Sequence, residues 1–216
     1  AKSSATAHQG DQAMESWLMP VLHPADFDEY IDFGLLGYAM SRYAGCYVGF
    51  KVVSETVEAG AIVELPDSRS ESVEPDFYQR PPDGLNIRWP DQQLAQEARH
   101  VNHRLKAAQA FARANGIDRE VWSKNGARIG VITVGKAQGD FLQAIDDLGF
   151  DERTARSKGI ALYKVGMPWP LDPGGVREFA EGLDIVLIIE EKRSFVERQV
   201  KDALFNMPGD KRPAVI

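Results

Sequence analysis

A polar segment near the start of the chain carries the first side chains that chemistry could use. Ser3, Ser4, His8 and Gln9 precede a helical pattern. Hydroxyl and imidazole groups in such a loop can line a site at a sheet edge, or they can simply cap a helix. A serine, a histidine and a downstream carboxylate such as Asp11 do not make a catalytic triad on spacing alone. The segment therefore indicates a capping or positioning loop.

A second candidate is Gly135-Lys136, where a predicted strand meets a helix. The residues from Gly130 to Ala137 nearly spell a phosphate-binding P-loop, which requires serine or threonine after the lysine and a flexible loop between the glycines. Here Ala137 follows the lysine, and the intervening residues end a buried strand. We therefore exclude nucleotide hydrolysis. Two alternatives remain: binding of an anion such as a coenzyme phosphate at the carboxyl edge of the sheet, or an ordinary β–α turn.

Metal chemistry has weak support in this sequence. Glu97 and His103 project about 120° apart on a helix, so with His100 they indicate a solvated face rather than one metal site. Cys46 is the only cysteine and lies in an apolar run, which predicts a buried and inert thiol. His23 precedes a proline and is interpreted as structural. We expect no metal site and no complete catalytic set here.

The composition is that of an ordinary globular protein. Of 216 residues, 44% are hydrophobic and 26% charged, and the net charge of −7 disfavours nucleic acid and anionic lipid as partners. No apolar run approaches the ~18 residues of a membrane span, and no signal peptide begins the chain. We expect a cytoplasmic protein. The missing initial methionine and the polar ends suggest a fragment of a longer polypeptide.

The elements that would position these residues fall into two regions. Residues 24–44 have a helical pattern whose predicted core face contains Phe27, Ile31 and Tyr38, beside a stripe of small residues from Gly34 to Ala44. That stripe indicates close packing against a helix or strand, a ligand or another subunit. Residues 46–53 and 61–65 read as strands. A proline-rich section, residues 66–90, predicts an ordered connection between domains.

The second region, residues 91–216, predicts an α/β domain. Its first helix covers about 24 residues. Three apolar strands, each followed by an amphipathic helix, then indicate a parallel sheet with helices on both faces. The strands are expected at 128–135, 160–165 and 184–190, and their helices at about 140–148, 173–181 and 195–205. The predicted core stripe of the first helix consists of Leu94, Ala98, Val101, Leu105, Ala108 and Ala112.

Several strings, in the expected order, resemble the long-chain bacterial indolepyruvate ferredoxin oxidoreductases. These are thiamine-diphosphate-dependent 2-oxoacid:ferredoxin oxidoreductases. The strings are Ser3 to Gln9, Tyr30 to Arg42, Gly84 to Pro90, Gln93 to Arg99 and Leu162 to Leu171. The resemblance implies that residues 1–65 are the latter part of a thiamine pyrimidine-binding domain and that residues 91–216 are transketolase carboxyl-terminal-like.

The resemblance also implies an activity for the complete enzyme. An aryl 2-oxoacid would be oxidatively decarboxylated to an acyl-coenzyme A, with electrons passing to ferredoxin through 4Fe–4S clusters. Thiamine diphosphate and magnesium would be bound largely by other domains of the polypeptide, and none of these cofactors wholly by this chain. Ser3, Ser4, His8 and Gln9 would face thiamine or substrate, and the enzyme is expected to form a homo-oligomer. The alternatives are a coenzyme A or anion-binding module, or a subunit-contact module without its own catalysis.

Overall fold

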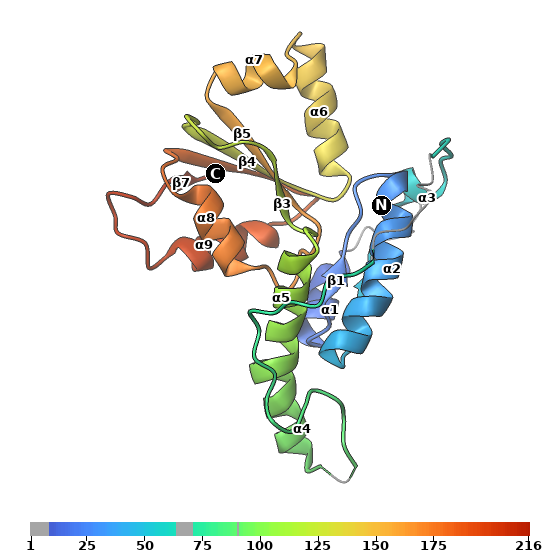
Figure 1. Ribbon diagram of the computed structural model, residues 1–216. Coiled ribbons are helices and arrows are strands. Elements are labelled where there is room, and N and C mark those ends of the chain that lie inside the picture. Colours follow the sequence, from blue (N-terminus) through green and yellow to red (C-terminus); the bar gives the residue numbers. More distant parts are fainter. Residues whose placement is uncertain (1–8, 64–70, 90) are drawn as a thin grey trace.

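A five-stranded sheet dominates the second half of the computed structural model, which describes residues 9–63, 71–89 and 91–216 (Figure 1). Its spatial order is β3-β5-β4-β6-β7. The last four strands of that order are mutually parallel, and β3 is antiparallel to β5. The strands are β3 (Arg119–Trp122), β4 (Ile129–Val134), β5 (Ile160–Val165), β6 (Ile185–Ile189) and β7 (Ala214–Val215).

Helices cover both faces of this sheet because its central strands are apolar on both sides. On β4, Val131 packs toward the face covered by α6 (Ala137–Asp147) and α7 (Glu152–Ser157). Ile132 packs toward the opposite face, covered by α8 (Pro173–Ala180) and α9 (Val196–Leu204). This is the α/β architecture that the sequence predicted, with helices on both faces of a largely parallel sheet. The transketolase carboxyl-terminal type stays a prediction. The two outer strands, β3 and β7, were not predicted.

The first region forms a smaller body beside the sheet. It contains α1 (Asp11–Ser16), β1 (Val21–Leu22), α2 (Phe27–Ala44), β2 (Gly49–Phe50) and α3 (Ser54–Val57), with β1 and β2 paired in parallel. The strand predicted at 46–53 is therefore much shorter than expected. Of the strand predicted at 61–65, residues 61–63 are irregular and the rest lie outside the described residues.

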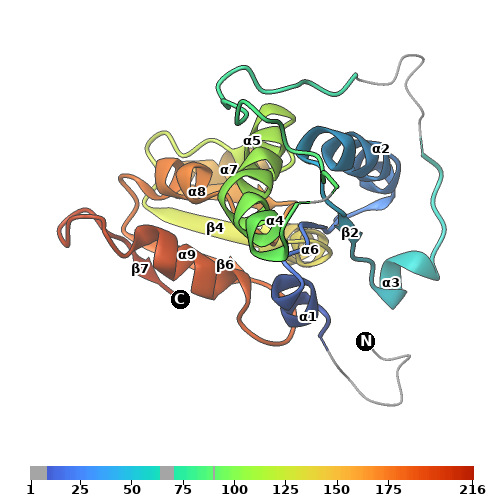
Figure 2. The same ribbon diagram turned by 90° about the horizontal axis from the view of Figure 1, so that it is seen from below.

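The buried face of α2 differs from the predicted one. Phe33, Met40 and Tyr43 are buried, whereas Tyr38 is 71% exposed. The reason is that α2 packs against the long helix ahead of the sheet, as Figure 2 shows from below, and this contact selects the face of Phe33. The prediction of close packing at the small-residue stripe is confirmed for Gly37, where an added Cβ would lie 3.4 Å from Leu22 Cδ1.

That long helix consists of α4 (Gln93–Arg99), a π-helical turn η1 (His100–Arg104) and α5 (Leu105–Ala114). The predicted core stripe is correct only after the π turn: Leu105 and Ala108 are buried, whereas Leu94 is 79% exposed. A π turn holds an extra residue, so it rotates the apolar face of α5 relative to that of α4. The exposed α4 then projects beyond the rest of the molecule (Figure 1).

Residues 71–89 precede the long helix in the chain and lie alongside it, without forming a helix or strand of their own. The Tyr78 hydroxyl donates to the His103 carbonyl at 2.8 Å, and Asn115 exchanges two hydrogen bonds with the backbone of Val73. These contacts hold Val73 and Tyr78 against the long helix. That residues 66–90 connect two domains stays a prediction. The domain boundaries themselves stay predictions.

Candidate functional site at the carboxyl edge of the sheet

The small first body is docked on the carboxyl edge of the parallel strands, where α/β sheets generally bind ligands. Val21 N–H donates to the Trp169 carbonyl at 2.7 Å, and His23 N–H donates to the Gly166 carbonyl at 2.8 Å. Gly166 follows β5 directly, and Trp169 lies in the segment between β5 and α8. The edge is therefore covered by the segment that leads from β1 into α2.

Seven ionisable residues lie at this junction, and we refer to them as the buried ionisable layer. Four of them are fully buried, a rare location for charged groups unless they are paired. The first body contributes Asp11, His23, Glu29 and Lys51, and the second region contributes Asp118, Arg119 and Lys164.

Two sets of ion pairs neutralise most of the charged side chains in the layer. Lys51 Nζ lies 2.8 Å from Asp11 Oδ2. Glu29 accepts from Lys164, which is fully buried on β5, and from Arg119 Nη2 at 2.9 Å. Burial alone would raise the pKa of Glu29, but Lys164 and the other donors outweigh it, so that pKa is lowered. Burial lowers the pKa of Lys164, although the Glu29 carboxylate opposes this change.

The start of α2 explains why Glu29 points at the sheet. Asp26 caps the helix by accepting from Glu29 N–H at 3.0 Å, and the Glu29 side chain reaches back to accept from Ala25 N–H at 2.8 Å. This reciprocal arrangement resembles a capping box, with the backbone donor at Ala25 instead of the cap residue Asp26. It fixes the Glu29 carboxylate at the helix start, where Lys164 meets it.

His23 differs from the other members of the layer because its side chain makes no hydrogen bond or ion pair within the described residues. Both ring nitrogens are buried and unpaired within the described part of the chain. Burial, and then Lys51, lower the pKa of His23 to about 3, so the imidazole is neutral at physiological pH. The ring covers Gly135: a Cβ at that position would lie 2.2 Å from His23 Cε1. With φ of +54°, Gly135 occupies a conformation that also favours glycine.

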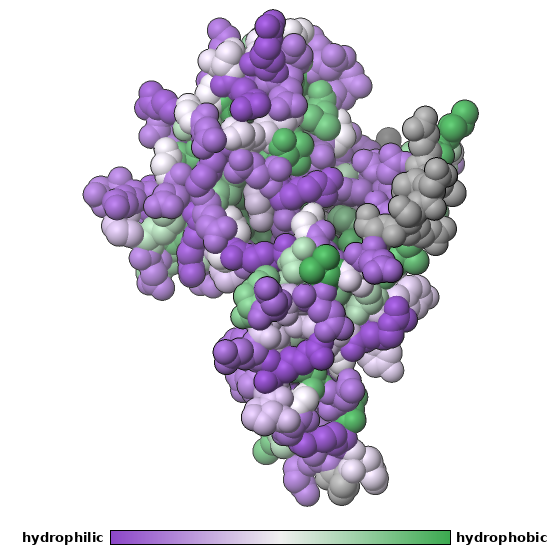
Figure 3. All heavy atoms as spheres, in the orientation of Figure 1, coloured by the Kyte–Doolittle hydropathy of each residue, from purple (hydrophilic) through white to green (hydrophobic). Residues whose placement is uncertain are grey.

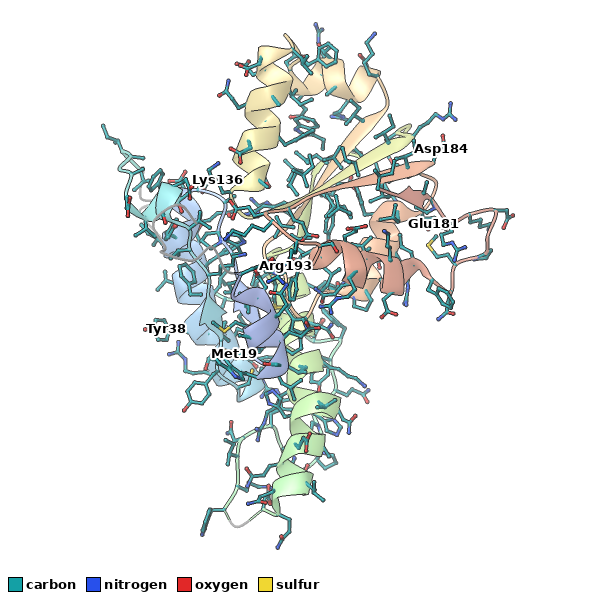
Figure 4. All side chains as sticks on the ribbon, turned by 180° about the vertical axis from the view of Figure 1, so that it is seen from behind. Met19, Tyr38, Lys136, Glu181, Asp184 and Arg193 are labelled. Atoms are coloured by element: carbon teal, nitrogen blue, oxygen red, sulfur yellow. The ribbon has the colours of Figure 1, made fainter. Side chains whose placement is uncertain are left out.

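The predicted site residues can now be placed. Ser3, Ser4 and His8 lie outside the described residues. Gln9 exchanges hydrogen bonds of 3.3 and 3.4 Å with the backbone of Arg193, which is labelled in Figure 4.

Gln9 also lines a cavity of about 10 Å³ beside His23, roughly the space of one water molecule. Because the His23 ring covers Gly135, two separately predicted segments meet around one histidine. Their functional roles stay predictions.

Lys136, labelled in Figure 4, is already paired. Its Nζ lies 2.6 and 2.7 Å from the two carboxylate oxygens of Asp140, one turn along α6. The hydrogen bonds that Lys136 donates to Asp140 raise the pKa of Lys136. A coenzyme phosphate at Gly135-Lys136 would therefore have to compete with Asp140.

Sequence reasoning missed the central residues of this site. His23 was interpreted as structural, and Glu29, Asp118 and Lys164 were not singled out. One available signal was Lys164 itself, a charge inside the apolar strand Ile160 to Val165. A lysine in a strand buried on both faces requires a carboxylate partner.

Residues 9–63, 71–89 and 91–216 include no group of three or more histidine, cysteine, aspartate or glutamate side chains fitted to a metal ion. His100 is instead bonded to the Leu18 carbonyl, with Nε2 at 2.6 Å. Burial raises the pKa of the Cys46 thiol to about 11. The described residues therefore offer no set of ligands that fits a magnesium diphosphate or an iron–sulfur cluster. Among the described helices, none has the length and apolar character needed to span a membrane.

Comparison with known proteins places the second region in a family. Residues 119–214, which include β3 to β6 and the first residue of β7, match the model described as the indolepyruvate oxidoreductase domain. This chain therefore contains an indolepyruvate oxidoreductase domain over these residues. The family resemblance seen in the sequence is therefore confirmed, while a bacterial origin stays a prediction.

Two similar family members are indolepyruvate oxidoreductase subunits IorA from Methanothermobacter species. The M. marburgensis protein is 23% identical over 86% of this chain, and the M. thermautotrophicus protein is 24% identical over 84%. This chain spans 28% of the length of each. The Pyrococcus horikoshii subunit is 35% identical, over 35% of this chain and 10% of its own length.

One similar solved structure is the 2-oxoglutarate:ferredoxin oxidoreductase from Magnetococcus marinus, with 2-oxoglutarate, coenzyme A and succinyl-CoA bound. The match has a TM-score of 0.37 and 12% sequence identity, over 63% of this chain and 22% of that chain. A likeness at this level assigns no site to this chain.

Proposed function

We propose that this chain is a supporting part of a 2-oxoacid:ferredoxin oxidoreductase. The complete enzyme would oxidatively decarboxylate an aryl 2-oxoacid such as indolepyruvate, form an acyl-coenzyme A and reduce ferredoxin. The family match and the IorA relatives support this proposal. The observation that carries the role of this chain is the meeting of Gln9 and Gly135 around His23 at the carboxyl edge.

In this proposal the chain positions groups and excludes water, and it performs no covalent step itself. The pairs Asp11–Lys51 and Glu29–Lys164 hold the first body against the sheet, which fixes the path of the segment that leaves Gln9. Thiamine diphosphate would supply the carbanion chemistry when bound, and its magnesium and the 4Fe–4S clusters belong to parts of the enzyme beyond the described residues. The expected cytoplasmic location is part of the same proposal.

The proposal can be tested by immunodepletion. Antibodies raised against this chain, added to an extract of its source cells, should remove the indolepyruvate-dependent and coenzyme A-dependent reduction of ferredoxin. Preimmune antibodies are the control. Full activity in the depleted extract would show that the chain has another function.

The supporting role makes a separate prediction. The purified chain should show no 2-oxoacid oxidation when thiamine diphosphate, magnesium, coenzyme A and ferredoxin are supplied. Turnover by the chain alone would contradict that role, although it would leave the family assignment intact.

A subunit-contact function is the second candidate. It is favoured by the surface of the projecting arm, which consists of α4 and the residues just before it. Figure 3 shows hydrophilic side chains over most of one face of the molecule, with hydrophobic ones in separate patches. On the arm, Trp89 and Leu94 are 94% and 79% exposed. Sedimentation equilibrium at high concentration tests this candidate. A monomer for both the wild type and Leu94→Asp would argue against self-association through α4.

A coenzyme A-binding module is the remaining alternative. Calorimetry should compare coenzyme A binding by the wild type and by Lys136→Ala. Binding that Lys136→Ala weakens would support the Gly135-Lys136 site, whereas equal or absent binding in both proteins would exclude it.

A further inference from the structure

A groove of about 340 Å³ opens between β3 and α8, and it shares no lining residue with the cavity beside His23. Its volume falls in the range of small-molecule sites, roughly 300–1,000 Å³. Polar and aromatic side chains from four elements face it. The lining residues include Arg113, Asp118, Arg119, Tyr163, Asp172 and Phe179.

The cations of the groove already have partners. Arg113 Nε donates to Asp172 Oδ2 at 2.8 Å, and Arg119 Nη2 donates to Glu29 of α2 at 2.9 Å. Lys124 donates to a backbone carbonyl of α8. Little uncommitted positive charge is left to attract an anion.

Two polar groups at the groove have unused hydrogen-bonding capacity. Asp118 Oδ1 accepts from the N–H groups of Gly166 and Met167, both at 2.8 Å, whereas Oδ2 is buried and unpaired within the described chain. The Tyr163 hydroxyl donates to no group described in the structure. Both residues line the same groove, and burial, followed by the charge of the Asp118 carboxyl, raises the pKa of Tyr163.

The charges of the groove favour a cation. When Asp118 is ionised, its carboxylate and those of Glu120, Asp172 and Glu178 outnumber the cations Arg113, Arg119 and Lys124 by one. One positive charge would restore neutrality. The rings of Tyr163 and Phe179, with centroids 5.1 Å apart, add an aromatic wall beside the carboxylates. Aromatic rings next to carboxylates favour an organic ammonium group over a strongly hydrated ion.

We propose that this groove binds a small primary ammonium compound with an aromatic or alkyl body. Its N–H groups donate to Asp118 Oδ2 and to the Tyr163 hydroxyl oxygen, and its body packs on Phe179. This site is independent of the proposed oxidoreductase function.

The binding should release a proton near neutral pH. Burial raises the pKa of Asp118 to about 7, and the nearby Asp172 adds to this, while the backbone donors of Gly166 and Met167 and the charge of Lys164 oppose it. The other charged groups near Asp118 and Tyr163 are Arg113, Arg119, Glu29 and Glu178. An ammonium ion binds only the ionised carboxylate, so it displaces the proton that Asp118 carries part of the time.

Calorimetry with benzylamine at pH 7 tests the proposal. The wild type should bind it saturably, with an enthalpy that changes with the ionisation enthalpy of the buffer, because protons are released. Benzyl alcohol has the same shape without the charge, and phenylacetate has the opposite charge. Both should bind at least about tenfold more weakly, the effect of losing one charge-assisted hydrogen bond.

Variants assign the binding to the groove. Asp118→Asn should weaken benzylamine binding at least about tenfold and abolish the proton release, whereas Asp146→Asn on the exposed surface of α6 should change neither. If circular dichroism shows Asp118→Asn to be unfolded, Tyr163→Phe decides, with binding weakened about threefold or more. Unchanged binding in the folded variants, tighter binding of phenylacetate, or no saturation by about 10 mM benzylamine would overturn the proposal.

Discussion

His23 and Asp118 affect stability in opposite directions as the pH changes. The folded-state pKa of His23 is lowered from 6.5 to about 3, so its contribution is present above pH 6.5 and is lost as the pH falls toward 3. The folded-state pKa of Asp118 is raised from 3.8 to about 7, so its contribution is present below 3.8 and is lost as the pH rises through 7. Between about pH 4 and 6.5 the two effects largely cancel, at about 1.4 kcal/mol per pH unit each.

We therefore predict that removing one group reveals the other. From pH 6.5 to 4.5, His23→Asn should gain about 2–3 kcal/mol in free energy of unfolding relative to wild type, because only Asp118 still contributes. Asp118→Asn should lose a similar amount over the same range. Urea denaturation at three pH values measures both. If the free energy of unfolding changed with pH in the same way in all three proteins, His23 and Asp118 would not be the groups responsible.

The contact between His23 and Gly135 makes a steric prediction. Gly135→Ala should lower the free energy of unfolding by about 2–4 kcal/mol, because the new Cβ overlaps the imidazole and the backbone has a positive φ. Gly139→Ala, at an open position of α6, should instead raise it by about 0.5–1 kcal/mol. Thermal unfolding measures both. Combining Gly135→Ala with His23→Ala should cost less than the sum of the single changes, and simple additivity would count against the contact.

At the scale of the elements, Glu29 has two roles in α2. It accepts a backbone hydrogen bond at the helix start, and it pairs with Lys164 of the sheet. Glu29→Gln should lower the free energy of unfolding by about 3–5 kcal/mol, because it leaves Lys164 charged, buried and poorly compensated. Asp32→Asn, on the exposed side of α2, should stay within about 0.5 kcal/mol of wild type. Chemical denaturation provides the comparison. The double change Glu29→Met with Lys164→Met should recover most of the loss, and failure to do so would mean that the pair is not the source of the effect.

The success of the sequence predictions also differs by element. The strands β4, β5 and β6 were predictable because continuous apolar runs have few other solutions in an α/β fold. Helix α2 was located correctly with the wrong face inward, since its apolar residues surround it and only its partner α5 selects one side. The π turn left no readable signal, so the face of α4 was also wrong.

At the scale of the whole molecule, the site was only partly predictable. The sequence could single out Gln9 and Gly135 because loops before helices and strand ends are recognisable positions, and their binding roles stay predictions. That they meet around His23 depends on how the first body docks on the sheet, and spacing along the chain does not encode this. The partners Glu29 and Lys164 come from distant segments for the same reason.

The sheet should also set the order in which the molecule opens. Amides of β4 are paired on both sides and buried on both faces, so they should exchange with deuterium at least about tenfold more slowly than those of β7 or α4. Hydrogen exchange followed by mass spectrometry measures this. Faster exchange in β4 than in β7 would contradict the core assigned to residues 119–214.

The order β3-β5-β4-β6-β7 has a consequence for synthesis on the ribosome. β3 and β4 are consecutive in the chain, yet β5 separates them in the sheet. As the polypeptide emerges, neither has its own neighbour available until the segment ending at Val165 has been translated. The apolar strand β4 is therefore unpaired when it leaves the exit tunnel. Slow translation before Ile160 would lengthen the time during which it can aggregate.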